Sequence, residues 1–245
     1  MTTISAAVLN DLAPTGVLRA AINLGNTVLA QTGADGAPKG VSVDLARALA
    51  QRLGVDVSFV IFDTAGKVFE ALKSNVWDIA FLAIEPARAT DIAFTAPYVL
   101  IEGRFIVRNE SPLNAVADFD RPGVRIAVGK GAAYDLYLSR TFRHATLVRE
   151  ASSAAALQHF VDGGLEAGAG VGQSVQAFAD ANPGLRLIAE RFMAIGQAMG
   201  TPKGREAGAA YLGQFVEEMK ASGFVADALV RSGQSAALAA PPAAA

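Results

Sequence analysis

The chain has 245 residues, a formal net charge of −2 and no cysteine, and these features already exclude several classes of protein. A nearly neutral chain offers no electrostatic footprint for nucleic acid or for an anionic membrane surface. Without cysteine there is no disulfide, no thiol nucleophile and no thiolate metal site, and the two histidines leave little material for a metal centre or a catalytic triad. We therefore expect no cofactor, no metal and no nucleic-acid partner.

The N-terminus has neither the pattern of a secretory signal nor that of a membrane anchor. Residues 1–8 contain no basic region and no long apolar core, and Asn10 and Asp11 interrupt the apolar residues that follow. Nowhere does an apolar run reach the roughly 20 residues of a transmembrane helix. The sequence therefore predicts no membrane insertion, and it is compatible with a mature or trimmed chain or with a cytoplasmic protein.

The first half of the chain alternates between patterns of strands and helices. Residues 43–53 place leucines on one face at helical spacing, and Gly54 is typical of the position after a helix. Pro86 favours a new helical turn directly after an apolar run. The segments with the length or period of strands are 18–22, 55–61, 79–83 and 92–98.

The second half continues the alternation, which favours a mainly parallel α/β sheet. Ser111-Pro112 is predicted to start a short helix. The low-complexity tail is predicted to be disordered after about residue 235. Strands are expected at 124–128, 167–171 and 186–189, and helices after Gly131, from Ser152 or Ser153, over 209–219 and over 224–230.

One ordered set of motifs resembles a known family. Asp78 precedes an apolar strand, Pro86-x-Arg88-Ala follows it, and Phe94-Thr95-x-Pro97-Tyr98 comes next. This order resembles the polar amino-acid branch, family 3, of the type II periplasmic solute-binding proteins. The match continues at 40–46 with 52–55, and at 124–128 followed by Gly131, and it spans about residues 16–233.

The resemblance implies a two-lobed α/β fold with two crossover segments that act as a hinge. Lobe 1 would comprise 1–101 plus 196–245, and lobe 2 would comprise 102–195. The ligand would lie in the cleft, outside the carboxyl ends of the strands. The expected crossovers are near 99–103 and 193–197, and closure around the ligand would be the functional motion.

Arg88 is the first candidate for ligand binding. Its planar guanidinium suits a bidentate contact with a carboxylate, which is the role that the resemblance implies. The alternative is a surface ion pair with Asp91. Gly131-Ala132-Ala133 offers backbone N–H groups at the start of a helix, which form a second possible anion site, or else a plain helix start.

The chain departs from the family pattern at three places. Ala83 stands where a Ser or Thr is usual, Asn26 stands where an aromatic wall is usual, and no acid for the ligand's ammonium group occurs near Gly172-Gln173. A second aromatic is also missing near Ala65. A buried ammonium group without an acid is costly. Either Glu85 or Glu102 therefore supplies the acid, or the ligand is a plain organic acid.

The remaining candidates are polar residues expected to open on the cleft. The two asparagines could bind ligand groups or could stabilise their own turns. Glu102 could form a hinge salt bridge, contact the ligand or act as a general acid. The full set of residues expected to bind ligand is Asn23, Asn26, Phe81, Ala83, Arg88, Glu102, Ala132, Ala133, Gln173 and Gln197.

The resulting hypothesis is a non-enzymatic solute receptor of an ABC importer. It is expected to be monomeric, periplasmic by resemblance, and to deliver a small carboxylate (an amino acid or an organic acid) to a permease. No catalytic residue and no metal ligand is predicted. One alternative is an enzyme on the same fold, similar to cyclohexadienyl or arogenate dehydratases, with Glu102 or Glu85 as general acid. The other is a cytoplasmic ligand sensor.

Overall fold

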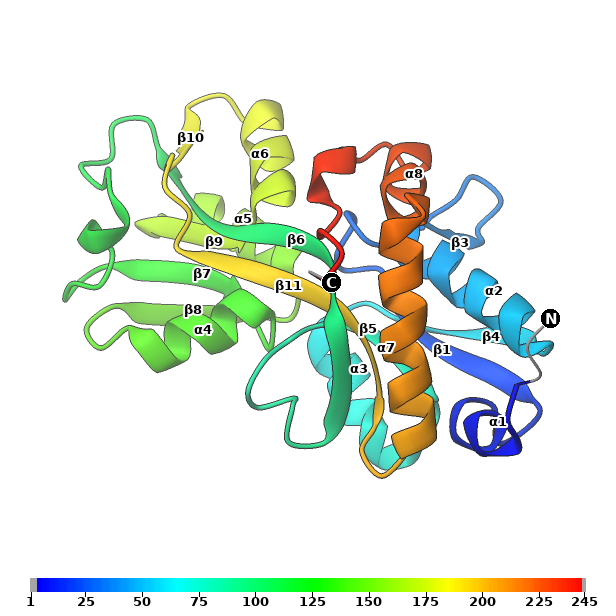
Figure 1. Cartoon of the computed structure of the whole chain (residues 1–245). Coiled ribbons are helices and arrows are strands. Elements are labelled where there is room, and N and C mark those ends of the chain that lie inside the picture. The colour runs from blue at the N-terminus through cyan, green and yellow to red at the C-terminus, as the bar shows by residue number, and fades with distance from the viewer. Residues whose placement is uncertain (1–3, 244–245) are drawn as a thin grey trace. The chain divides into compact units, whose positions relative to one another are not determined.

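The computed structural model describes residues 4–243, which divide into two compact units. Unit 1 comprises the described residues up to Leu100 and from Gly196 onward, and unit 2 runs from Ile101 to Ile195. The chain passes from one unit to the other inside two long strands, β6 (Ile92–Arg108) and β11 (Met193–Pro202), which are labelled in Figure 1. Helices and strands alternate in both units, so the predicted α/β class is confirmed.

The sheet of unit 1 is built around a parallel core of three strands. β1 (Val17–Asn23) pairs in parallel with both β4 (Asp56–Phe62) and β5 (Ile79–Ala83). β11 joins β5 in the antiparallel direction, with Gln197 opposite Ala83. Every residue of β5 is buried, as the apolar run predicted. The parallel strands therefore end together at one edge of the sheet, which we call the carboxyl edge of unit 1.

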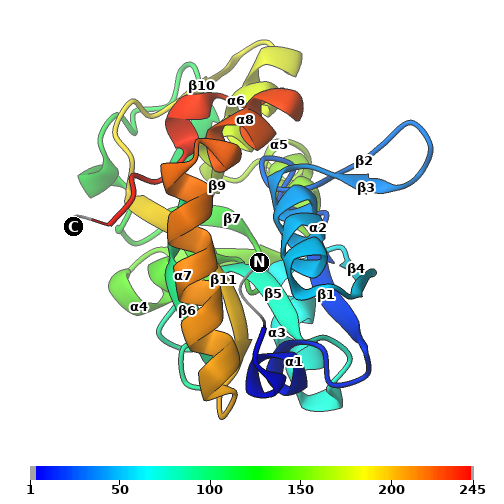
Figure 2. The ribbon, with the colours of Figure 1, turned by 45° about the vertical axis from the view of Figure 1, so that its right-hand side comes forward.

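Helices of unit 1 pack on this sheet and on one another. α2 (Val41–Leu53) contacts β1 and β4, and it ends at Gly54, whose φ of 72° and N–H bond to Ala50 O match the predicted C-terminal signal. A small hairpin of β2 (Gln31–Thr32) and β3 (Pro38–Lys39) protrudes beside α2 (Figure 2). The remaining helices are α1 (Ala6–Leu12), α3 (Ala65–Glu70) with the 3-10 turn η1 (Ala71–Ser74), α7 (Glu206–Ala221) and α8 (Phe224–Arg231).

A buried carboxylate stands just before β5 and joins three segments of unit 1. Asp78 is fully buried, and its oxygens accept hydrogen bonds from Arg19 Nη2 at 2.8 Å and Nε at 2.9 Å. Arg205 Nη1 adds a third side-chain hydrogen bond at 2.9 Å. Arg19 lies on β1 and Arg205 precedes α7, so the cluster links segments that are far apart in the sequence. Two guanidinium groups on one carboxylate compensate its loss of water.

Unit 2 repeats the same plan with different strands. β7 (Arg125–Gly129) pairs in parallel with β8 (Thr146–Glu150) and β9 (Ala167–Val171). β6 pairs antiparallel with β9 and also with β10 (Leu185–Leu187). Phe105 and Phe119 stack in its core with ring centroids 4.0 Å apart. Its helices are α4 (Ala133–Thr141), α5 (Ser153–Asp162), α6 (Gly172–Ala181) and the 3-10 turn η2 (Val116–Asp118).

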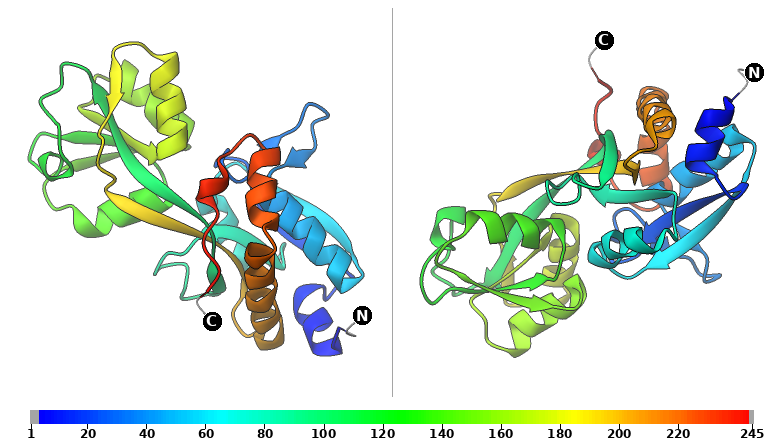
Figure 3. Two further views of the ribbon diagram at one scale, coloured as in Figure 1. Left: turned by 45° about the horizontal axis from the view of Figure 1, so that its top comes forward. Right: turned by 90° about the horizontal axis from the view of Figure 1, so that it is seen from below.

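Two expectations about local structure are wrong. Ser111-Pro112 does not start a helix, because the Ser111 hydroxyl accepts from the Leu113 N–H at 3.3 Å and closes a turn instead. The tail is ordered over its described part, which is the red segment that leads to the C-terminus in Figure 3. A 3-10 turn η3 (Ala236–Leu238) is followed by Ala240, whose N–H donates to Tyr98 O at 2.9 Å. Backbone bonds of this kind need no large side chain, and small alanines allow the close approach to β6.

Candidate functional site

The carboxyl edge of unit 1 collects several of the predicted ligand-binding residues. β1 ends at Asn23 and β5 ends at Ala83, and Gln197 lies opposite Ala83 on β11. Gln197 is buried, with 5% of its surface exposed. In open α/β sheets, ligands bind outside the carboxyl ends of the strands. The structure therefore places these three residues at the edge where a ligand is expected.

Arg88 is held against the last residue of β5 by the turn that follows the strand. The Arg88 N–H donates to Glu85 O at 3.0 Å, and the Ile92 N–H donates to Arg88 O at 3.0 Å, which closes the turn on both sides. The side chain then folds back so that Nη1 donates to Ala83 O at 3.2 Å. Only 1% of Arg88 is exposed. The hypothesis of an Arg88–Asp91 surface pair is therefore wrong, because the guanidinium is buried.

Burial shifts the pKa of this cation. Desolvation lowers the pKa of Arg88 to about 10, and the attraction of the Glu85 carboxylate, which is itself buried, opposes only part of this effect. Arg88 remains protonated at neutral pH. An additional anion at this position would raise the pKa again and would be held by a strong, poorly screened interaction. The electrostatics of the carboxyl edge thus favour an anionic ligand group.

The two asparagines stabilise their own turns. Asn23 Oδ1 accepts from the Gly25 N–H at 2.9 Å, and Asn26 Oδ1 accepts from the Val28 N–H at 3.3 Å. These are the turn contacts that such residues commonly make. Both bonds use the amide oxygen, so the turn fixes each amide group while Nδ2 takes no part in it. The turn interpretation of the two asparagines thus accounts for these hydrogen bonds, and ligand binding by them stays a prediction.

Phe81 has a packing role in the structure. It is 2% exposed, and its ring meets that of Tyr98 edge to face, with centroids 6.0 Å apart and an interplanar angle of 89°. Aromatic pairs favour this geometry. The Tyr98 hydroxyl in turn lies 3.0 Å from Ser42 Oγ. We therefore interpret Phe81 as a core residue of unit 1 that supports the carboxyl edge from inside.

In unit 2, two N–H groups of the predicted anion site at the start of α4 already have acceptors within the chain. The Gly131 N–H donates to Asp135 Oδ2 at 2.8 Å, and the Ala132 N–H donates to Gly129 O at 3.1 Å. Asp135 is 2% exposed and also accepts from Arg149 Nε at 2.9 Å. The expectation that Gly131 and Ala132 offer free N–H groups is therefore wrong, because the acid in the first turn of α4, which begins at Ala133, bonds back to the loop.

Glu102 forms a salt-bridge network within unit 2. One carboxylate oxygen accepts from Arg104 Nε at 3.0 Å and Nη2 at 2.7 Å, and the other accepts from Arg191 Nη1 at 3.0 Å. Hydrogen bonds from Arg104, and further from Arg191, lower the pKa of Glu102. A carboxyl group with a lowered pKa carries no proton near neutral pH. Glu102 is consequently a poor general acid.

Gln173 and Glu102 line one depression of about 610 Å³ on unit 2. Arg104 and Gln176 line it as well, and sequence reasoning did not find them, since neither belongs to a recognisable motif. Gln173 Oε1 is buried and accepts no hydrogen bond from the residues that the structure describes. A buried acceptor of this kind needs a donor from a ligand or a water molecule. The depression does not include Ala132 or Ala133.

Comparison with known proteins identifies the family. The model of the bacterial extracellular solute-binding proteins, family 3, matches residues 19–231. The chain belongs to this family. The resemblance seen in the sequence motifs is therefore confirmed.

Solved structures similar to this family 3 chain are two-lobed binding proteins of the expected type II fold. The solute receptor for L-cysteine of Neisseria gonorrhoeae shares 21% identity, with 93% of each chain covered and a TM-score of 0.79. An amino acid ABC transporter substrate-binding protein from Streptococcus pneumoniae, bound to L-arginine, shares 19%, with 96% of this chain and 99% of that chain covered and a TM-score of 0.78. At these identities, the likeness shows the fold alone.

A third structural relative bears on the alternative of an enzyme. An ancestral amino acid-binding protein described as a precursor of cyclohexadienyl dehydratase shares 23% identity, with 92% of this chain and 98% of that chain covered and a TM-score of 0.77. Among curated proteins, none matches the sequence. Within residues 4–243 of this family 3 protein, no group of three acidic or histidine side chains could hold a metal ion. Over the same part of the chain, no helix is long and apolar enough to cross a membrane.

Proposed function

We propose that this family 3 protein is the solute receptor of an ABC importer, that it acts in the periplasm, and that it binds a small ligand through a carboxylate. The observation that carries the proposal is Arg88. A planar cation is buried beside the last residue of β5, and its pKa is lowered because burial outweighs the attraction of Glu85. A ligand carboxylate at the carboxyl edge would form charge-assisted hydrogen bonds with this guanidinium group.

Glu85 is the acid best placed to accept an ammonium group of the ligand. It begins the turn that carries Arg88, it is 2% exposed, and it lies close enough to Arg88 to influence its pKa. Glu102, the other acid considered, is committed to Arg104 and Arg191. The proposed ligand class is therefore the small carboxylates, and Glu85 determines whether an α-ammonium group is accepted as well.

The test is a calorimetric titration with matched ligands. Mass spectrometry first identifies the molecule that co-purifies with the protein, and the titration then compares the corresponding amino acid, its 2-hydroxy acid and its uncharged carboxamide. We expect the carboxamide to bind about two orders of magnitude more weakly than the acid, because two charge-assisted hydrogen bonds are lost. Equal binding of acid and carboxamide would exclude a carboxylate anchor.

The same titration shows whether Glu85 binds an ammonium group of the ligand. If Glu85 accepts it, the 2-hydroxy acid binds more weakly than the amino acid, and Glu85→Gln removes the difference. If the 2-hydroxy acid binds as well or better, the natural ligand is an organic acid. Both results leave the carboxylate anchor intact, so the two parts of the proposal are tested separately.

We further propose that the ligand closes the two units about the two strands that join them. Such closure is a general way in which binding proteins of two compact parts retain a ligand. Small-angle scattering should then show a smaller radius of gyration at saturating ligand than without ligand. Equal radii would contradict closure without affecting the carboxylate anchor.

The second candidate function is a dehydratase, favoured by the likeness to an ancestral precursor of cyclohexadienyl dehydratase. A dehydratase needs a proton donor near the leaving hydroxyl. Glu102 does not suit this role, since arginine contacts lower its pKa. Incubation with prephenate decides between the two functions. We expect no product, and catalytic turnover would show that the protein is an enzyme and not a receptor.

A further inference from the structure

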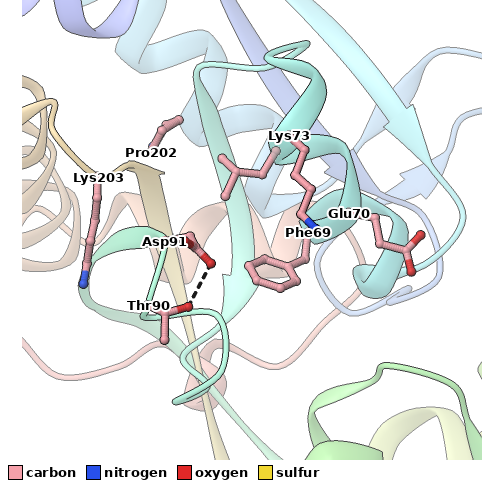
Figure 4. A pocket seen from close by; sticks show the side chains of 8 residues that line it. Phe69, Glu70, Lys73, Thr90, Asp91, Pro202 and Lys203 are labelled. Carbon is pink, nitrogen blue, oxygen red and sulfur yellow. Dashed lines mark hydrogen bonds between the residues drawn. The ribbon is translucent and has the colours of Figure 1, made fainter.

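Unit 1 has a cavity of about 520 Å³, whose lining side chains are drawn in Figure 4. It lies toward the end of β5 that is opposite the carboxyl edge. Pro202, which lines it, ends β11, and the antiparallel register puts Gly200 opposite Ala80 but Gln197 opposite Ala83. Residues of α3 and η1 form another wall, and the turn before β6 forms a third. The cavity is therefore separate from the edge that ends in Asn23 and Ala83.

The floor of this cavity is apolar. Phe69, Leu72 and Pro202 are half-buried, and their exposed parts face the same space. Phe69 and Leu72 also pack against the core cluster of Trp77 and Ile92, so the floor is fixed by the fold. A concave apolar surface of this size is typical of a site for a small molecule.

The rim carries both signs of charge on different sides of the aromatic ring. Figure 4 shows the Asp91 carboxylate and the Lys73 ammonium group on opposite sides of Phe69, while Glu70 points away from it. Thr90 Oγ1 donates to Asp91 Oδ2 at 2.8 Å and orients this carboxylate. Lys73 forms no ion pair with any residue in the described part of the chain. Lys203, which lies farther along the rim than Asp91, forms none there either.

We propose that this cavity binds a zwitterionic amino acid with an apolar side chain. The ammonium group lies toward Asp91, the carboxylate lies toward Lys73, and the side chain rests on Phe69, Leu72 and Pro202. A ligand with one charge only would face a like charge on one side of the ring. This site is additional to the proposed anion site at Arg88 and does not depend on it.

The experiment uses L-phenylalanine as the probe and the full chain labelled with ¹⁵N. We expect saturable shifts of the backbone amide signals of residues 69–73, 90–91 and 203. Lys73→Ala and Asp91→Asn should each weaken the binding at these signals by about two- to five-fold, as is usual for solvent-exposed charge pairs. Asp91→Asn keeps the oxygen that Thr90 bonds, so the local fold is preserved.

The controls separate this site from the one at Arg88 and from non-specific contact. Lys67→Ala, on α3 and paired with Asp63 outside the cavity, should leave the affinity unchanged. Arg88→Met should abolish any shifts at the carboxyl edge but leave those of 69–73. The proposal is overturned if no shifts occur at 69–73, 90–91 and 203 up to millimolar probe. It is equally overturned if 3-phenylpropionate, which lacks the ammonium group, binds as well as L-phenylalanine.

Discussion

Buried charges of opposite sign lie at the two ends of β5, and they differ in the partners that the chain gives them. At the amino end, Asp78 receives three side-chain hydrogen bonds from Arg19 and Arg205. At the carboxyl end, Arg88 donates to the neutral carbonyl of Ala83, and burial lowers its pKa in spite of Glu85. Two arginine side chains surround the first charge, whereas burial shifts the pKa of the second.

This difference separates a structural charge from a candidate binding group. A charge whose partners are all supplied by the chain stabilises the fold and has little to offer a ligand. A buried charge whose pKa is strongly shifted is a candidate for a functional site. In unit 2, Asp135 and Glu102 resemble Asp78, because arginine side chains already pair with both. By this criterion, Arg88 is the site residue of first choice.

The largest effect is expected at the amino end of β5. Asp78→Asn keeps the shape of the side chain but leaves two guanidinium groups without their carboxylate. Breaking a buried pair in this way costs about 3–5 kcal/mol of unfolding free energy, and the lower end applies here, because the Arg19 and Arg205 side chains are 22% and 17% exposed. Urea unfolding measures the loss.

The matched control for this prediction is Asp63→Asn. Asp63 pairs with Lys67, and its side chain is 65% exposed, so its loss should cost much less stability than that of Asp78. Folded Asp78→Asn should bind ligand as the parent does. If the two variants lose equal stability, the Asp78 cluster does not stabilise the fold, and the proposed contrast between Asp78 and Arg88 is wrong.

The next effect is expected at the carboxyl end, in binding rather than in stability. Arg88→Lys and Arg88→Met should each weaken carboxylate binding by about two orders of magnitude, because lysine cannot reproduce two parallel N–H donors. Arg88→Met keeps most of the buried volume, so its unfolding free energy should stay within about 1.5 kcal/mol of the parent. Calorimetric titration and urea unfolding measure the two quantities, and unchanged affinity in both variants would remove Arg88 from the site.

The pH dependence gives an independent check of the same residue. The pKa of Arg88 in the free protein is about 10. Affinity for the carboxylate should therefore be constant around neutral pH and decline as the pH rises above about 10, where Arg88 loses its charge. A ligand held only by backbone N–H groups would show no such decline.

A smaller effect is expected at the start of α4. Asp135→Ala removes the acceptor for the Gly131 N–H and for Arg149 Nε, and hydrogen bonds to charged groups contribute about 1.5–3 kcal/mol to stability. Ligand affinity should not change, since this carboxylate serves the fold of unit 2. A gain in carboxylate affinity would instead show that the vacated helix start is an anion site, as the sequence first suggested.

The sequence predicted the elements whose signals are local. The apolar run of β5, the leucine spacing of α2 and the αL glycine after it are all present as expected. The contacts of Asp78 were not predicted, because its partners Arg19 and Arg205 lie 59 and 127 residues away and no local pattern joins them. The role of Asp135 had a local signal, namely an acid in the first turn of a helix that follows a glycine loop.

The smallest effect is expected at Glu102, and it decides whether this residue serves the fold or the ligand. The Arg104 contact, with that of Arg191, lowers the pKa of Glu102 below its value of 4.5 in an unfolded chain. The pairing therefore stabilises the fold above about pH 4.5, and this contribution is lost as the pH falls through the lower pKa of the folded state. Because the Glu102 side chain is 35% exposed, Glu102→Gln should cost less than about 1 kcal/mol at pH 7 in urea unfolding, and the difference from the parent should shrink in acid. Ligand affinity should stay within about two-fold of the parent, whereas a ten-fold loss would return Glu102 to the ligand-binding residues and would make unit 2 the source of the ammonium-binding acid.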